Sequence, residues 1–207
     1  MKLILARHGE TPANRDRLSL GRRDVPLTEK GRLQAEALAE SLASLPIAAV
    51  YSSPLCRALD TARAIASHHR LEVIVDEDLT EMDAGDLDGL TQDEIQARYR
   101  DFITLWLSPD GAQRRPPGSS ESLQDVQDRA WRAVQRLAER HDDETVVAGS
   151  HFGVIHAIIY RALGLPLTSF GRLRHDLAAA STLDLRDDRS VLVNLNDTCH
   201  LDVLGLA

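Results

Sequence analysis

Short apolar segments alternate along the chain with longer segments that have the periodicity of an amphipathic helix. This alternation limits the fold more than any other feature of the sequence. Four apolar segments have the length of buried strands: residues 3–6, 47–51, 71–75 and 145–148. Four others repeat apolar residues at every third or fourth position: residues 31–45, 55–69, 126–137 and 154–163. Strands and helices in alternation form a largely parallel sheet that is covered on both faces.

The sequence therefore predicts an α/β fold, a three-layer α/β/α sandwich around a mostly parallel central sheet, with residues 1–207 in one domain. Residues 181–185 and 191–195 suggest a closing pair of strands. Residues 107–120 are rich in proline and glycine and are expected to form a surface loop, either a lid or an insertion. In such folds, ligands bind at the carboxyl ends of the strands.

The charge of the chain disfavours two classes of partner. Its formal net charge is -8 and its pI is about 5.4, so the average surface repels nucleic acids and anionic membranes. The apolar run at the amino terminus ends at Arg7, too early for a signal peptide or a membrane span. Cys56 and Cys199 are too few and too far apart for a disulfide framework or a zinc site. We expect a cytoplasmic protein with no metal and no cofactor.

Arg7 and His8 follow the first predicted strand directly, where a ligand is expected. A neutral histidine ring is a nucleophile, and a guanidinium group can contact phosphate oxygens with a planar fork of donors. Taken alone, an arginine next to a histidine is also common on surfaces and at helix ends. The pair becomes informative together with the rest of the chain.

Five motifs in the chain match one family in order. They are LARHGETPAN at 5–14, YSSPLCRALDTA at 51–62, the group Glu81, Gly85 and Gly89, PPGSSESLQDVQDR at 116–129, and VVAGSHFGVIHAI at 146–158. In this order and spacing they resemble the histidine phosphatase superfamily, which includes the cofactor-dependent phosphoglycerate mutases. The resemblance implies a phosphoglycerate mutase-like fold.

The resemblance also implies roles for single residues. It makes His8 the phosphate acceptor and Glu81 the proton donor, and places Arg7, Arg57 and His151 around the transferred group. It further implies substrate or phosphate contacts at Thr11, Asn14, Gly21 and Phe152. From the residues alone, Asn14 is equally typical of a turn, and Glu10, Asp83 and Asp86 remain alternative proton donors.

These residue types suit phosphoryl transfer without a metal. A phosphoryl group in transfer spreads negative charge over three oxygens, which preorganised positive donors stabilise. Arg7, Arg57 and a protonated His151 would supply this charge. A carboxylic acid at Glu81 can protonate the departing alkoxide, and as a carboxylate it can then activate water.

Hydrolysis is favoured over mutase-type transfer. The chain lacks the longer insertion before the ESL motif at 121–123 that resemblance to the mutases would imply, and it has SHFGV at 150–154 in place of an HGNS-like motif. The alternatives are phosphoglycerate mutase-type transfer and a phosphate-binding regulatory module without turnover. The second is disfavoured because such a module does not need both a nucleophile and an acid.

The sequence predicts a small phosphorylated metabolite as substrate but does not identify it further. The run LNDTCHL at 195–201 resembles metal-independent phosphoserine phosphatases, but those enzymes have a histidine where this chain has Ala84. α-Ribazole phosphatases and broad-specificity phosphatases match the motifs equally well. Arg22 and Arg23 either contact a substrate carboxylate or second phosphate, or are solvated loop cations. The sequence is compatible with a monomer or a homodimer.

Overall fold

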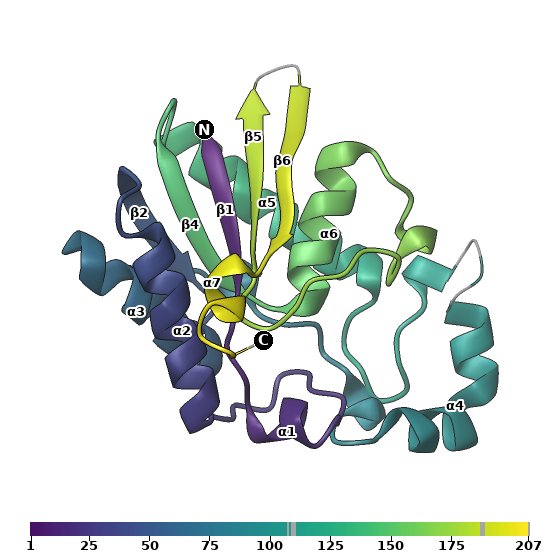
Figure 1. The fold of residues 1–207 in the computed structure, drawn as a ribbon. Helices are drawn as coiled ribbons and strands as arrows, with labels where there is room; N and C mark the ends of the chain where they lie inside the picture. The colour runs from purple at the N-terminus through teal and green to yellow at the C-terminus, as the bar shows by residue number, and fades with distance from the viewer. Residues whose placement is uncertain (107, 109–110, 187–188, 207) are drawn as a thin grey trace.

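A six-stranded sheet forms the centre of the molecule. The computed structural model describes residues 1–106, 108, 111–186 and 189–206. The strands are β1 (Lys2–Arg7), β2 (Ile47–Ser52), β3 (Val73–Val75), β4 (Thr145–Ser150), β5 (Ala180–Arg186) and β6 (Arg189–Asp197). The α-helices are α1 (Pro12–Arg15), α2 (Glu29–Leu42), α3 (Cys56–His69), α4 (Gln92–Trp106), α5 (Leu123–Arg140), α6 (Phe152–Leu163) and α7 (Cys199–Asp202). Figure 1 shows their arrangement.

The sheet has the strand order β3-β2-β4-β1-β5-β6. The pairs β3–β2, β2–β4 and β4–β1 are parallel, whereas β5 runs antiparallel to β1, and β6 runs antiparallel to β5. The predicted mostly parallel sheet and its closing pair of strands are therefore confirmed. β5 and β6 are consecutive in the chain and can pair antiparallel directly. Parallel strands need a longer connection, and helices provide it here.

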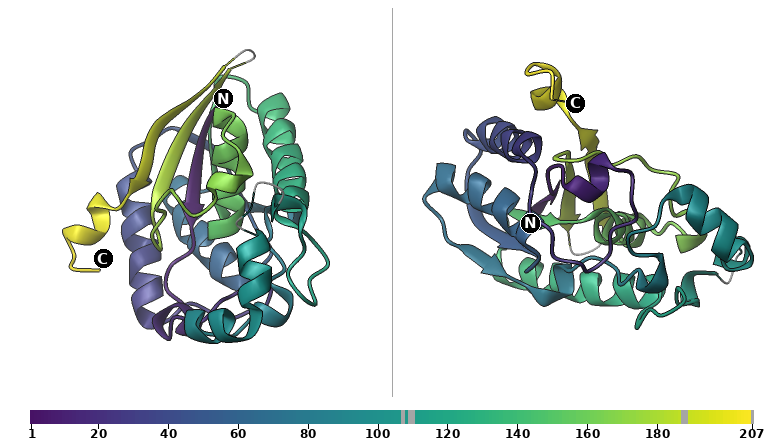
Figure 2. Two further views of the ribbon diagram at one scale, coloured as in Figure 1. Left: turned by 90° about the vertical axis from the view of Figure 1, so that its right-hand side faces the viewer. Right: turned by 90° about the horizontal axis from the view of Figure 1, so that it is seen from below.

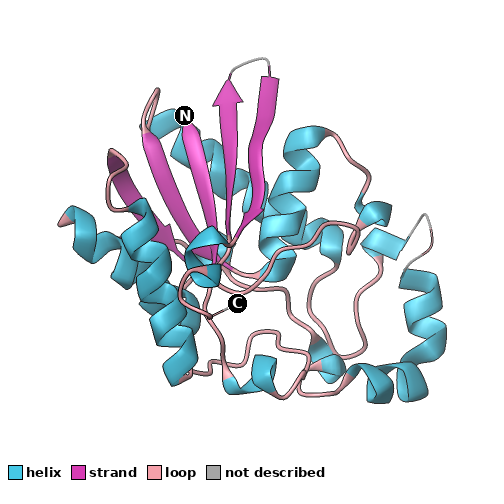
Figure 3. Ribbon diagram, in the orientation of Figure 1, coloured by secondary structure: helices cyan, strands magenta, loops and turns pink. Residues whose placement is uncertain are grey.

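Helices cover both faces of the sheet, as Figure 3 shows with strands in magenta and helices in cyan. Alternate residues of β1 point to opposite faces. Leu3 and Leu5 pack in one apolar cluster with α5 and α6, while Ile4 and Ala6 pack in another with α2 and α3. Because both faces of β1 are buried, the strand is a continuous apolar run, as the sequence predicted. This arrangement is the predicted three-layer α/β/α sandwich.

Two details of the predicted helices were wrong. Leu33, one of the apolar residues that repeat in the predicted helix at 31–45, is 54% exposed, because α2 buries the neighbouring face through Gln34, Ala35 and Leu38. The same helix ends at Leu42 instead of residue 45.

The last helix of the chain, α7, packs beside α2, as the yellow segment in Figure 2 shows.

Helix α4 was not predicted. Ile95, Phe102, Ile103 and Trp106 have the spacing of one helix face, but only Ile95 is buried, and the helix is kinked at Tyr99. The predicted loop at 107–120 follows it. Its described residues contain a short 3-10 helix at Gly111–Gln113; Gly111 and Pro116 are buried, whereas residues 113–115, 118 and 120 are exposed, as expected of a surface loop that is anchored at two points. Residues 107, 109 and 110 of that prediction lie outside the described part of the chain.

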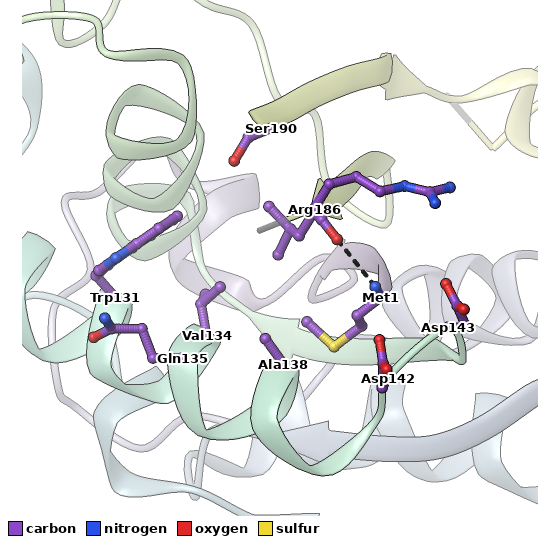
Figure 4. Close-up of a pocket in the computed structure, with 10 residues that line it drawn as sticks. Met1, Trp131, Val134, Gln135, Ala138, Asp142, Asp143, Arg186 and Ser190 are labelled. Atoms are coloured by element: carbon purple, nitrogen blue, oxygen red, sulfur yellow. Dashed lines mark hydrogen bonds between the residues drawn. The ribbon is translucent and has the colours of Figure 1, made fainter. Parts of the chain in front are cut away.

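A hollow of about 550 Å³ lies at the amino-terminal end of β1 (Figure 4). Met1, Trp131 and Arg186 are among its lining residues, and the amino group of Met1 donates a hydrogen bond to the Leu185 carbonyl over 3.0 Å. Because Arg7 and His8 lie at the opposite end of β1, this hollow is separate from the predicted site.

Among the described helices, none is long and apolar enough to cross a membrane.

Candidate active site

His8 is held in one orientation at the carboxyl end of β1. Its backbone N–H donates to the Ser150 carbonyl and its carbonyl accepts from the Ala178 N–H, which extends the pairing of the sheet. In the ring, Nδ1 lies 2.8 Å from the Gly9 carbonyl oxygen. A carbonyl only accepts, so Nδ1 carries the proton and Nε2 keeps a lone pair. Within the described part of the chain Nε2 has no hydrogen-bond partner.

Gly9 allows the turn that follows His8. A Cβ atom at position 9 would overlap the backbone carbonyl of Gly31 at the start of α2. The Gly9 N–H donates to the Thr61 hydroxyl, which in turn donates to the Arg57 carbonyl. The turn after β1 is thereby attached to α3, the helix that carries Arg57.

Arg57 and Arg7 supply the positive charge of the site. Arg57 is completely buried, and its two terminal nitrogens donate to the carbonyls of Arg23 and Gly21 over 2.8 and 2.7 Å. Arg7 donates from Nη1 to the His175 carbonyl and lies 5.1 Å from the centre of the Phe152 ring. Burial lowers the pKa of Arg7 to about 10, so it stays charged at neutral pH.

Each of these arginines also has a buried N–H that lacks a partner. The Nε atoms of Arg7 and Arg57 are both buried without a hydrogen bond in the described structure. A buried donor left unpaired costs about 1–3 kcal/mol. Such donors suit a site that is completed by an anion, as the fork of a guanidinium pairs well with phosphate oxygens.

His151 faces His8 from the beginning of α6. The two ring centres are 5.2 Å apart, and Nε2 of His151 lies 2.8 Å from the hydroxyl oxygen of Ser53. Ser53 follows β2 and lies in the second matched motif, YSSPLCRALDTA, but no role was predicted for it. No signal in the sequence alone pairs Ser53 with His151, because 98 positions separate them.

His151 is neutral in the ligand-free protein, so the positive charge predicted for it during phosphoryl transfer has to come with the bound phosphate. Burial, assisted by the charges of Arg57 and Arg7, holds the pKa of His151 well below its usual value of 6.5. Burial and the same two arginines lower the pKa of His8 in the same direction. Both rings are therefore neutral before an anion binds, which suits His8 as a nucleophile.

We expect both rings to remain neutral in the ligand-free protein as the pH falls from about 8 to about 6. The unfolded chain binds protons on these histidines near pH 6.5, whereas the folded chain does not, so stability decreases as the pH falls through that range. Nitrogen chemical shifts of the two imidazoles would measure this directly. Titration of either ring near pH 6.5 would contradict the assignment.

Glu81 lies against the start of α6, next to His151. Its two carboxylate oxygens accept hydrogen bonds from the backbone N–H groups of Met82 and Gly153 over 2.7 and 3.2 Å. A Cβ atom at position 153 would lie 2.5 Å from Oε1 of Glu81, so glycine at this position makes room for the carboxylate. The arrangement brings Glu81 to the same strand ends as His8 and His151.

The alternative proton donors are held by other contacts. Glu10 accepts a hydrogen bond from the Thr28 hydroxyl over 2.8 Å. Burial would raise the pKa of Asp83, but hydrogen bonds from Ser120 and Gly85 lower it, so its charged form is favoured. Asp86 belongs to a short 3-10 helix, Gly85–Leu87, that packs against the turn at Gly118. Glu81 therefore remains the candidate acid.

A buried ion pair positions the backbone of Glu81. Arg129 donates to both carboxylate oxygens of Glu121 over 3.0 and 3.1 Å, and it also donates to the Glu81 carbonyl. Arg22 contacts the same carboxylate and the same carbonyl. These contacts were missed from the sequence, although Glu121 and Arg129 both lie in the fourth matched motif.

We expect Glu121→Ala to lower the free energy of unfolding by about 3–5 kcal/mol, because Arg129 would stay buried without its partner. Urea unfolding would measure the loss. Asp60→Ala is the matched control, since Asp60 pairs with Arg63 on an exposed face of α3. The control should change stability by no more than about 1 kcal/mol. Similar losses for the two variants would contradict the positioning role of Glu121.

The remaining predicted residues lie around this centre. Thr11 and Asn14 form the capping box of α1, in which the Asn14 carbonyl oxygen accepts from the Thr11 backbone and hydroxyl. The Asn14 side chain thus caps α1, and its contact with phosphate stays a prediction. The Gly21 carbonyl accepts a hydrogen bond from Arg57 and so helps to orient the guanidinium group. Arg23 pairs with Asp88 over 2.8 Å, so neither Arg22 nor Arg23 is simply a solvated cation.

The site combines a neutral histidine that has a free lone pair with the guanidinium groups of Arg7 and the buried Arg57 and with a carboxyl group. This set belongs to proteins that transfer phosphoryl groups through a histidine. The family model described as histidine phosphatase superfamily (branch 1) matches residues 3–198, and the chain belongs to this superfamily. The predicted family and fold are confirmed.

Individual relatives agree with this assignment. Phosphoserine phosphatase 1 of Hydrogenobacter thermophilus is 34% identical over 97% of this chain and 94% of that protein. Adenosylcobalamin/alpha-ribazole phosphatase of Escherichia coli is 32% identical over 95% of this chain and 96% of that protein. A solved mutant of phosphoserine phosphatase from Entamoeba histolytica, in complex with phosphoserine, has a TM-score of 0.87 at 29% identity and covers 97% of this chain and 98% of that one. The predicted enzyme class, a phosphatase, is confirmed by these similarities.

Proposed function

We propose that this protein is a metal-independent phosphomonoesterase that transfers the phosphoryl group of a small phosphorylated metabolite first to Nε2 of His8 and then to water. The observation that carries the proposal is the orientation of the His8 ring. Its Nδ1–H is held by the Gly9 carbonyl, while Nε2 keeps its lone pair in a ring that feels the charges of Arg7 and of the buried Arg57. This is the state in which an imidazole attacks phosphorus.

In the first step, Nε2 of His8 forms a bond to phosphorus as the bond to the ester oxygen breaks. Glu81 gives its proton to the departing oxygen, so that an alcohol leaves instead of an alkoxide. Arg7 and Arg57 stabilise the charge on the phosphoryl oxygens through their unpaired N–H groups. The phosphorylated ring gains a positive charge, which its hydrogen bond to the Gly9 carbonyl stabilises.

In the second step, water attacks the phosphohistidine. The Glu81 carboxylate accepts a proton from this water, and the bond between phosphorus and Nε2 breaks. Inorganic phosphate leaves, and His8 and Glu81 return to their initial protonation states. His151 starts neutral, and the charge of a bound phosphate favours a proton on its unpaired, buried Nδ1.

The test is hydrolysis of 4-nitrophenyl phosphate by the purified protein in the presence of a chelator. We expect turnover to continue unchanged, because the positive charge of the site comes from Arg7 and Arg57. Loss of activity in the chelator, with recovery on adding a divalent metal, would overturn the proposal. In the described part of the chain, no group of three or more His, Cys, Asp or Glu side chains is arranged to hold a metal ion.

The physiological substrate and the assembly stay predictions. A panel with phosphoserine, α-ribazole phosphate and the phosphoglycerates would compare the substrates that the relatives suggest. Interconversion of the phosphoglycerates without release of phosphate would support the mutase alternative instead. A cytoplasmic location, a homodimer and a single domain over residues 1–207 also stay predictions; the free thiols of Cys56 and Cys199 are compatible with a reducing compartment.

A further inference from the structure

A cavity of about 280 Å³ borders Glu81 on the side of α4. This volume lies at the low end of small-molecule pockets, about 300–1,000 Å³, so it suits one ring or a short alkyl chain. Its walls are mostly apolar and come from α4, the segments near Glu81 and the start of α6. The apolar lining residues are Leu20, Met82, Ala84, Leu87, Ile95, Phe102, Ile103, Trp106, Pro116, Phe152 and Phe170.

Four of the eight phenylalanine, tryptophan and tyrosine residues of the chain line this cavity. The protein has three phenylalanines and two tryptophans, and all three phenylalanines and Trp106 line the cavity. Neighbouring rings lie within contact, with centres 6.4 Å apart for Phe102 and Trp106, 5.7 Å for Trp106 and Phe170, and 5.9 Å for Phe170 and Phe152. In a chain with so few aromatic residues, this placement indicates a wall that recognises an apolar group.

The aromatic wall reaches the phosphate site. Phe152 lines the cavity and also lies under the Arg7 guanidinium group. Phe152 therefore extends the aromatic wall toward the reacting group. The cavity is thus continuous with the proposed active site.

A second, polar hollow lies on the other side of Arg7. It has a volume of about 420 Å³, and Glu10, Asn14, Arg174 and Asp176 are among its lining residues. The position of the acid, Glu81, decides which of the two hollows receives the leaving group. An ester oxygen that receives a proton from Glu81 must lie beside Glu81, which lines the apolar cavity and is not among the described lining residues of the polar one.

We propose that the substrate is a phosphate monoester whose leaving alcohol carries an apolar group, most favourably an aromatic ring, and that this group binds in the cavity between α4 and Phe152. The inference rests on the proposed function. Among the described lining residues of the cavity, Glu81 is the one ionisable side chain, so no cation there could pair with a carboxylate on the leaving group. A leaving group such as serine would place two charges against apolar walls.

The test compares kcat/KM for 2-phenylethyl phosphate with kcat/KM for ethyl phosphate and for phosphoserine. The first two esters have primary alkyl leaving groups of similar basicity, so their ratio reports on the binding of the phenyl group. We expect 2-phenylethyl phosphate to be preferred by roughly ten- to a hundredfold over ethyl phosphate, and by more over phosphoserine. A ratio near one, or a preference for phosphoserine, would overturn the inference.

A pair of variants on α4 assigns the preference to the cavity. Phe102→Ala removes part of the aromatic wall, and we expect the preference for the phenyl ester to fall roughly tenfold. Leu105→Ala is the matched control, because Leu105 is exposed on the same helix and does not line the cavity; its ratio should equal that of the parent protein. If the ratio of kcat/KM for the phenyl ester to that for the ethyl ester is the same in Phe102→Ala and Leu105→Ala, the cavity does not bind the phenyl group and the inference is overturned.

Failure of this inference is distinguishable from failure of the proposed function. If folded protein hydrolyses none of the three esters nor 4-nitrophenyl phosphate, the phosphatase proposal itself is wrong. If it hydrolyses them without a preference for the phenyl ester, and turnover is lost in His8→Ala, the phosphatase proposal stands and only the recognition by the cavity is wrong.

Discussion

His8→Ala is expected to reduce turnover of every phosphate monoester by a factor on the order of 10⁴ or more, because alanine cannot accept the phosphoryl group. The loss should be independent of the leaving group. In the parent protein, rapid quenching with labelled substrate should trap an acid-labile phosphoryl group, and peptide mapping should locate it at His8. The size of the loss is measured by comparing the turnover of 4-nitrophenyl phosphate by the parent protein and by His8→Ala.

The fold should tolerate this substitution. The His8 ring makes one hydrogen bond, to the carbonyl of its neighbour Gly9, and the strand pairing at this position uses the backbone alone. The thermal unfolding curve should therefore stay cooperative, and the variant should still bind inorganic phosphate through Arg7 and Arg57. His68→Ala at the end of α3 is the matched control and should keep full activity. Label found at His151 instead of His8 would reverse the roles of the two rings.

Much of this site could be predicted from the sequence because it is built on strand ends. The order β2-β4-β1 places three parallel strands side by side, and the register pairs Arg7 with Ser150 and Ser52 with Gly149. The residues that follow these strands must then meet at one edge of the sheet. An apolar run followed by Arg7 and His8 is a local pattern, but the roles of His8 and His151 could be predicted only from the resemblance of five ordered motifs to one family.

The features that were missed depend on contacts between distant segments. The ion pair of Glu121 with Arg129 orients Glu81 from 48 positions away, and the Ser53 contact orients His151 from another strand. The neutral state of His151 in the ligand-free protein could not be predicted, because it depends on complete burial beside two arginines, which sequence spacing does not report. The aromatic wall escaped notice for the same reason: Phe102, Phe152 and Phe170 are far apart in the chain and on three different segments.

Glu81→Gln is expected to reduce kcat/KM for alkyl phosphates by roughly 10²- to 10⁴-fold, because the departing alkoxide then has no proton donor. The effect on kcat/KM for 4-nitrophenyl phosphate should be far smaller, since nitrophenolate leaves without protonation. The comparison must use kcat/KM, which reports on the steps up to formation of the phosphohistidine. The second step, in which Glu81 activates water, is common to all substrates and affects kcat instead.

The substitution also changes a structural contact, and this has to be separated from catalysis. Both carboxylate oxygens of Glu81 accept backbone N–H groups, whereas glutamine offers one oxygen and turns an NH₂ group toward the other donor. A general distortion would therefore lower kcat/KM for alkyl and aryl esters alike, while loss of the acid lowers it for the alkyl ester alone. Asp83→Asn is the matched control, because Asp83 is held as an anion by Ser120 and Gly85 and should show no dependence on the leaving group. If that variant, and not Glu81→Gln, discriminates between the two esters, the proton comes from Asp83.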